Sequence, residues 1–222
     1  MLRVSVAPHI QKKITTSSIM YNTLIALVPA LLAGIYFFGF PALKLALICM
    51  ATAVACEAGM QALMGRKLAV KNGSGLLLGL LFALICSSEL PWWVAVLGTA
   101  IAVILGREIY GGLGNNPFNA VLVGWAVVRV SFPGKMLTWI MPEPLFGLDP
   151  GGYIEYPPLE VIKLDGAEAL IDLPWLDLFI GNVPGTIGTV SVVAILMGGI
   201  YLLVRRTITW HIPVSFLASA WL

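Results

Sequence analysis

The chain has 222 residues, of which 59% are hydrophobic and 11% are charged, and its mean hydropathy is +0.94. A soluble globular domain carries roughly 25% charged residues, so this composition excludes an ordinary soluble protein and indicates an integral membrane protein. The formal net charge of +2 is too small to indicate a nucleic-acid-binding protein.

Apolar runs, taken in chain order, predict an all-α polytopic membrane protein with about seven transmembrane helices. A helix needs about 20 mostly apolar residues to cross the hydrocarbon core. The expected spans are residues 20–40, 43–64, 74–88, 92–108, 119–132, 187–204 and the run that follows Pro213. Pro41 is expected to turn the chain between the first two spans. The last run is still apolar at Leu222, so the sequence is expected to be C-terminally incomplete.

Three cysteines, Cys49, Cys56 and Cys86, lie inside these apolar runs. They show neither the Cys-x-x-Cys spacing nor the Cys/His spacing that is typical of metal ligands. We therefore expect small buried thiols, and no metal site built by this chain alone.

The character of the sequence changes between residues 133 and 184, which hold eight of the 14 prolines, eight acidic residues and two lysines. This composition predicts a folded or draped extramembrane segment rather than a span. Five of the expected spans precede this acidic segment, and the remaining spans follow it from residue 185 onward.

Lysine and arginine are distributed unevenly between the two sides of the predicted bundle. With a cytoplasmic N-terminus, the inner side carries nine of these cations and the outer side four. Cytoplasmic loops of membrane proteins carry an excess of Lys and Arg, so we expect this orientation, with the acidic segment outside. The inner set is Arg3, Lys12, Lys13, Arg66, Lys67, Lys71, Arg107, Arg205 and Arg206.

Residues 111–119, with the sequence GGLGNNPFN, separate two apolar runs in the middle of the chain. Clustered glycines, three asparagines and a proline disfavour a regular helix. Irregular backbone is tolerated at membrane depth only where protein buries it or where it lines a polar cavity. We interpret the stretch as a broken or re-entrant segment that cradles a polar ligand, with a tight turn at the membrane surface as the alternative.

Charged residues also interrupt or adjoin the apolar runs. Glu57 lies within the second span, which indicates a role in an ion or proton path, with pairing to Arg66 or another base as the alternative. Arg107 and Glu108 directly precede the irregular stretch. For these two we favour a charge pair at the membrane interface over a phosphate site or the closure of a cavity.

Residues 185–191, with the sequence GTIGTVS, open the sixth expected span with two glycines and three hydroxyl groups. Free amides and hydroxyls at a helix N-terminus suit a polar or anionic ligand. Ordinary capping and close helix packing are the alternative for the same residues. No Ser/His/Asp set, phosphate-binding loop or dinucleotide fingerprint is present, so no catalytic residue is assigned.

Several ordered motifs carry a family resemblance over the whole chain: GGLGNNPFN at 111–119, SFP at 131–133, GTIGTVS at 185–191 and WHIP at 210–213. APHI at 7–10, NGS at 72–74 and PWW at 91–93 agree with them. With these motifs the sequence resembles the RnfD family, the D-type subunits of Rnf electron transport complexes. The NqrB protein of the sodium-pumping NADH:quinone reductase is a related protein.

The resemblance implies a membrane flavoprotein made of two related five-helix halves. Residues 1–132 would be the first half, residues 133–184 the extracytoplasmic acidic segment, and residues 185–222 the start of the second half. Members of the family relay electrons between ferredoxin and NAD within a multisubunit complex of the prokaryotic cytoplasmic membrane. This relay is coupled to the movement of Na⁺ or H⁺.

One departure from the family pattern concerns the flavin. The resemblance implies FMN bound through a phosphoester to a threonine in an Ala-Thr-Pro-Leu motif, but Pro157 stands in that position. Proline has no hydroxyl group, so we expect no covalent FMN there. A non-covalent flavin, FMN or riboflavin, is predicted instead, held by polar residues that allow close approach. These residues are Asn115, Asn116, Asn119, Gly185, Thr186, Gly188 and Ser191.

Three functions are left open by the sequence. The first is a flavin-dependent redox subunit of an Rnf-type translocase, with Glu57 in the ion path. The second is a flavin-free structural or assembly subunit of the same complex, which Pro157 favours. The third is a channel or transporter for a small polar solute, because broken helices also occur in transporters. No side chain here supplies a suitable redox potential, so electron transfer requires a borrowed cofactor.

Overall fold

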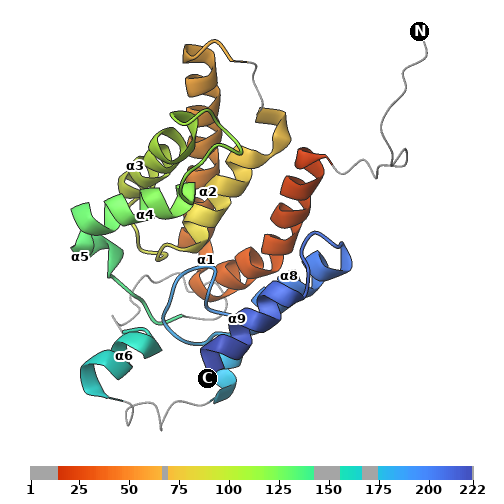
Figure 1. The fold of residues 1–222 in the computed structure, drawn as a ribbon. Helices are drawn as coiled ribbons and strands as arrows, with labels where there is room; N and C mark the ends of the chain where they lie inside the picture. Colours follow the sequence, from red (N-terminus) through yellow and green to blue (C-terminus); the bar gives the residue numbers. More distant parts are fainter. Residues whose placement is uncertain (1–14, 67–69, 143–155, 167–174, 222) are drawn as a thin grey trace.

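The computed structural model describes residues 15–66, 70–142, 156–166 and 175–221, and every element in these ranges is helical (Figure 1). The expectation of an all-α chain is therefore confirmed for the described residues. The APHI motif, four of the nine cations of the expected inner side and parts of the acidic segment lie outside these ranges.

The first element, α1 (Thr16–Leu63), contains the first two expected spans as two arms that meet at a kink. The kink lies at Gly39, whose φ of 65° and ψ of −146° are not helical. A positive φ is readily adopted by glycine, whereas Pro41 has a fixed negative φ that suits the first turn of the following arm. The turn was therefore predicted in the right place but assigned to the wrong residue.

The remaining elements are shorter than the expected spans. They are η1 (Val70–Asn72), α2 (Ser74–Leu84), α3 (Trp92–Val103), the π-helical turn η2 (Ile104–Glu108), α4 (Ala120–Ser131), α5 (Pro133–Met136), α6 (Pro158–Asp165), α7 (Trp175–Ile180), α8 (Val192–Val204) and α9 (His211–Trp221). Among the described residues, α1 alone is long and apolar enough to cross a membrane by itself. The number of seven spans is thus not confirmed.

The shortening has a local cause at α8. This helix was predicted to begin at residue 187, but it begins at Val192. The residues before it form turns, and their backbone amides bond elsewhere: Ile187 N donates to Cys86 O at 3.1 Å, and Gly188 N donates to Leu84 O at 2.8 Å. These carbonyls lie at and just beyond the C-terminal end of α2. Because they are satisfied by the segment before α8, α2 ends earlier and α8 starts later than the apolar runs suggest.

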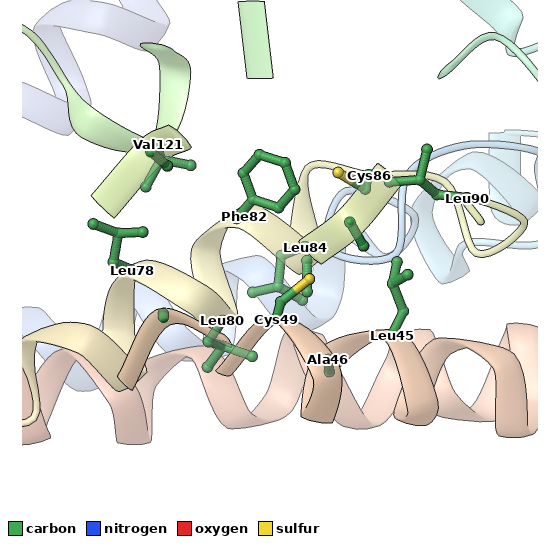
Figure 2. Packing of buried hydrophobic residues seen from close by; sticks show 14 of the residues in the cluster. Leu45, Ala46, Cys49, Leu78, Leu80, Phe82, Leu84, Cys86, Leu90 and Val121 are labelled. Atoms are coloured by element: carbon green, nitrogen blue, oxygen red, sulfur yellow. The ribbon is translucent and has the colours of Figure 1, made fainter. Parts of the chain in front are cut away.

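The core lies where the second arm of α1 packs against α2. Figure 2 shows Ala46 and Cys49 of α1 facing Leu80 and Leu84 of α2. The close approach depends on small residues, since Ala46 and Cys49 are fully buried and Gly79 of α2 lies directly against the α1 backbone. Small residues at helix interfaces allow this kind of packing in membrane proteins. The prediction of buried free thiols is confirmed for Cys49 and Cys86, while Cys56 is half-buried.

Gly79→Ala is expected to lower the free energy of unfolding by about 1–3 kcal/mol, because the new Cβ would overpack the interface. It would lie 2.6 Å from Cys49 O and 2.7 Å from Met50 Cα. The same substitution at Gly59, which has nothing within 4 Å of an added Cβ, is the matched control. Gly59→Ala should be neutral or stabilise the helix by up to about 1 kcal/mol. Thermal unfolding in detergent measures both variants, and equal midpoints would contradict this account of the interface.

Two of the described cations of the expected inner side, Arg205 and Lys71, lie near the start of α1, where Tyr21 also donates from its hydroxyl to Lys71 O at 3.1 Å. Arg205, which follows α8, donates from Nη2 to Asn22 Oδ1 at 3.4 Å, near the start of α1. Ser17 donates to Asn72 Oδ1 at 3.0 Å, which places the end of η1 beside the first turn of α1. This arrangement agrees with a shared side for these residues. The direction of the chain across the membrane stays a prediction.

Candidate functional site

Three charged side chains form a buried cluster: Glu57 in the second arm of α1, and Arg107 and Glu108 in η2, each at most 2% exposed. Arg107 Nη2 lies 2.6 Å from Glu57 Oε1 and 2.9 Å from Glu108 Oε1. Arg107 Nε also donates to Glu108 Oε1 at 3.0 Å. One guanidinium therefore bridges two carboxylates from elements about 50 residues apart in the sequence.

This geometry bears on two predictions. Arg107 and Glu108 form the predicted charge pair with each other, but both side chains are buried against α1. Glu57 does pair with a base, as the alternative for that residue stated, but the base in closest contact is Arg107. Whether Glu57 also serves an ion path stays a prediction.

Two further side chains donate to Glu57 Oε1: Ser74 Oγ at 2.9 Å and Gln61 Nε2 at 3.3 Å. Ser74 is the first residue of α2, so the Glu57 carboxylate lies at the positive end of that helix. An added Cβ at Gly75 would collide with Glu57 Oε2, which explains why glycine follows Ser74. The i, i+4 spacing of Glu57 and Gln61 already places both on one helix face, whereas the contact with Ser74 depends on tertiary packing.

The π-helical turn η2 determines where Arg107 and Glu108 lie. Its hydrogen bonds run from Ile109 N to Ile104 O at 3.1 Å and from Gly112 N to Arg107 O at 3.2 Å, five residues apart in each case. π-helical turns of this kind occur frequently at functional sites. Gly106 packs its backbone against Ala120 at the start of α4, which fixes the turn in the bundle.

A cavity of about 240 Å³ adjoins the cluster. Its lining residues are Glu57, Gln61, Arg66, Asn72, Ser74, Glu108, Gly111, Gly112 and Leu113. Two carboxylate oxygens, Glu57 Oε2 and Glu108 Oε2, are buried and make no hydrogen bond. Arg66 lies at the cavity with its side chain 38% exposed; its Nη1 is 3.9 Å from Glu108 Oε2 and donates to Glu108 O at 3.4 Å. The site is therefore a polar cavity lined by two buried carboxylates, each with one oxygen that accepts no hydrogen bond.

The predicted break at residues 111–119 is irregular in the structure, as expected. Gly111 and Gly112 have φ values of 117° and 92°, which favour glycine, and they wrap the chain over the end of η2. Asn119 caps α4, since its Oδ1 accepts from Val121 N at 3.0 Å. Asn115 is exposed, while the Oδ1 atom of Asn116 is buried without a hydrogen-bond partner.

The second predicted group, in residues 185–191, makes internal contacts. Gly188 packs against Leu84, and Ser191 caps α8 through Ala194 N at 3.4 Å. The hydroxyls of Thr186 and Thr189 lie 2.7 Å apart. Gly185, also in this group, is half-buried within the turns that precede α8.

The two groups of predicted flavin contacts lie at opposite ends of α2. Asn115 of the first group lies against Gly111, which lines the cavity with Ser74, the first residue of that helix. Gly188 of the second group contacts Leu84, the last residue of the helix. The structure therefore does not bring the two groups together into one site. Flavin binding by either group stays a prediction.

Pro157 lies immediately before α6, in the cap position of that helix, and Pro158 is its first residue. Proline is favoured at the first helical position because the amide there has no partner within the helix. Glu160 of α6 accepts from Trp139 Nε1 at 3.2 Å, which ties α6 to the chain that follows α5.

Comparison with known proteins agrees with the resemblance. The model of the NQR2, RnfD, RnfE family matches residues 3–222. The D-type subunit of a Na(+)-translocating ferredoxin:NAD(+) oxidoreductase complex from Acetobacterium woodii is 38% identical over 220 residues, which cover 98% of this chain and 67% of the relative. The D-type subunits of ion-translocating oxidoreductase complexes from Citrobacter koseri and Cronobacter sakazakii are 32% and 34% identical, and the matches cover 98% of this chain and 71% of each relative. The chain therefore belongs to the NQR2, RnfD, RnfE family, whose matched relatives are subunits of ion-translocating oxidoreductase complexes.

Proposed function

We propose that this chain is the D-type membrane subunit of an Rnf-type ion-translocating ferredoxin:NAD oxidoreductase in a prokaryotic cytoplasmic membrane. In this role it relays electrons through a non-covalent flavin and helps to couple the relay to the movement of Na⁺ or H⁺. The names of the relatives support the reaction and the complex. Its partners are then the other subunits of the complex and the lipid bilayer.

The observation that carries the ion-coupling part is the buried cluster of Glu57, Arg107 and Glu108. Ionisable side chains within membrane segments are energetically costly and usually mark ion or proton paths. Here Glu57 lies in α1, the one described helix long enough to span a membrane, and it borders a polar cavity. One oxygen of each carboxylate accepts no hydrogen bond, so it has acceptor capacity for a cation or a proton.

The flavin part is supported by Asn116, whose buried Oδ1 atom has no hydrogen-bond partner. A buried amide oxygen without a partner suits a ligand that offers an N–H donor, as a flavin ring does. Asn115 and Asn119 flank it, and the glycines at 111, 112 and 114 allow close approach. When bound, the flavin supplies the redox chemistry that no side chain of this chain provides. The residues around it contribute binding and orientation.

A flavin-free structural or assembly subunit of the same complex is the second candidate. Pro157 favours it, because no hydroxyl stands in the position where the family attaches FMN. The internal contacts of residues 185–191 favour it as well, since these residues are already engaged in packing and capping. A channel or transporter for a small polar solute has no support among the relatives, which are named as oxidoreductase subunits.

A flavin assay on the purified complex separates these candidates. The complex is resolved by denaturing electrophoresis and the band of this subunit is inspected for fluorescence, while released flavin is measured in the supernatant. We expect released flavin attributable to this subunit and no fluorescent band. A fluorescent band would mean a covalent flavin and would refute the argument from Pro157. The absence of any flavin from a complex that still requires this subunit for assembly would support the structural role.

A further inference from the structure

We propose that the groove between the first arm of α1, α2 and α8 binds one anionic phospholipid, with an acyl chain inside the groove and the phosphate group at Arg205 and Arg206. The groove has a volume of about 330 Å³. Its lining includes Leu27 of α1, Leu81 of α2 and Leu202 of α8. The two arginines have no part in the proposed function.

Two neighbouring glycines of α8 shape the groove. This helix lies alongside the first arm of α1 (Figure 1), where an added Cβ at Gly198 would collide with Ala26 O. An added Cβ at Gly199 would have nothing within 4 Å, and this residue lines the groove. The two helices therefore touch at Gly198 and leave open space beside Gly199.

The wall of the groove suits a hydrocarbon chain. Its polar side chains are two threonines, and both hydroxyls already have partners. Thr23 Oγ1 donates to Ile19 O at 2.9 Å, and Thr189 Oγ1 lies 2.7 Å from the hydroxyl oxygen of Thr186. A polar ligand would leave its own groups without partners against such a wall, which is costly. An acyl chain has no polar groups to satisfy, so it fits the groove best.

Positive charge lies at the end of the groove near the start of α1. Arg205 follows the lining residue Leu202 by three positions, which places both on one face of α8. Its Nη2 donates to Asn22 Oδ1 at 3.4 Å, beside Thr23 of the lining. Arg205 and Arg206 are exposed, and the ion pairs among the described residues involve neither of them. Two cations without an acidic partner in the described chain therefore lie at the groove.

The arginine side chains are not needed to cap α8. Backbone amides satisfy its last carbonyls, since Arg206 N donates to Leu203 O at 2.9 Å and Thr207 N donates to Leu202 O at 3.0 Å. Both guanidinium groups are thus left for a ligand. Basic residues beside membrane segments bind anionic lipid headgroups, and a guanidinium matches the geometry of phosphate oxygens.

The length of the groove agrees with a lipid of one leaflet. Ile195 and Leu202 both line it, and Arg205 stands one turn beyond Leu202. The ten residues from Ile195 to Arg205 advance about 15 Å along the helix. This is half of the hydrocarbon core of about 30 Å, the depth that an acyl chain of one leaflet reaches. In the expected orientation this is the cytoplasmic leaflet, which carries anionic lipids.

The test is photo-crosslinking of the purified complex with phosphatidylglycerol that carries a diazirine in one acyl chain. Labelled peptides are identified by mass spectrometry at lipid concentrations below saturation, where the yield follows affinity. We expect labels on α8 and on the first arm of α1. Phosphatidylcholine with the same acyl chain is the control, because its headgroup has no net charge. It should label the groove at least about fivefold less.

Two variants separate the acyl chain from the phosphate. Gly199→Leu fills the open space and should abolish labelling of the groove by both lipids. Gly59→Leu is its control, since Gly59 also has nothing within 4 Å of an added Cβ but does not line the groove. Arg205→Gln should lower labelling by phosphatidylglycerol about fivefold and leave labelling by phosphatidylcholine unchanged. Lys135→Gln, at an exposed lysine of α5, should change neither.

Three results would overturn the proposal. Equal labelling of the groove by the two lipids would exclude a phosphate site at the arginines. Undiminished labelling in Gly199→Leu would exclude the groove as the place of the acyl chain. The absence of any label on α8 and α1 would mean that another protein segment covers the groove. Arg205 is exposed, so Arg205→Gln tests the phosphate site even if Gly199→Leu fails to assemble.

Discussion

Arg107→Gln is expected to destabilise the protein by about 3–5 kcal/mol, which is the usual effect of removing one partner from a buried ion pair. The substitution leaves the carboxylates of Glu57 and Glu108 buried together without the guanidinium that bridges them. Their mutual repulsion and lost solvation then oppose folding of η2 against α1. The amount of this subunit in the assembled complex and its thermal midpoint in detergent measure the effect.

Matched variants separate charge from side-chain size at Arg107. Arg66→Gln is the same substitution at a half-exposed arginine and should reduce stability by no more than about 1 kcal/mol. Arg107→Lys keeps the charge but loses the paired contacts of Nε and Nη2 with Glu108, so an intermediate loss is expected. The double variant Arg107→Gln with Glu108→Gln returns the net charge of the buried cluster to its original value. It should therefore recover part of the stability that Arg107→Gln loses. If Arg107→Gln were as stable as the unchanged protein, the buried bridge would not exist.

Glu57→Gln is expected to reduce ion uptake per electron transferred at least about tenfold while electron transfer continues at a lower rate. Glutamine is close to glutamate in shape and can still accept from Ser74 and Arg107, so the helices stay packed. What disappears is the negative charge that would attract and release a cation or proton. Proteoliposomes containing the complex allow ion uptake and NAD reduction to be recorded in the same sample.

Glu89→Gln is the control for Glu57→Gln. Glu89 follows α2 at its C-terminal end, whereas the cluster lies at the N-terminal end of that helix. The substitution removes the same charge without touching the cavity, and the ratio of ions to electrons should stay unchanged. A normal ratio in Glu57→Gln as well would remove Glu57 from the ion path.

The sequence predicted the helices and the break between them because both depend on local composition. Apolar runs gave the positions of α1, α2, α3 and α4, and the glycines of residues 111–119 gave the irregular stretch. The lengths of α2 and α8 were overestimated, because apolar residues near 187 form turns that bond to the end of α2. Hydropathy does not distinguish a buried turn from the end of a buried helix.

The cluster was predicted only in part for a different reason. Glu57 was predicted to be functional because it is an ionisable residue within a span, and that prediction does not depend on which residues pack around it. The burial of Arg107 and Glu108 follows from the π-helical turn and from a tertiary contact with α1, neither of which has a signal in the local sequence. Sequence reasoning therefore assigned them to the interface, where charges that flank apolar runs are usually found.

The most direct test of the central claim is a reconstitution of the complex in proteoliposomes with and without this subunit. Reduced ferredoxin and NAD are supplied, and NAD reduction and the uptake of Na⁺ or H⁺ are followed together. The account predicts that both activities require the subunit and that adding it back restores them together. Ion uptake coupled to NAD reduction at the full rate in its absence would contradict the account.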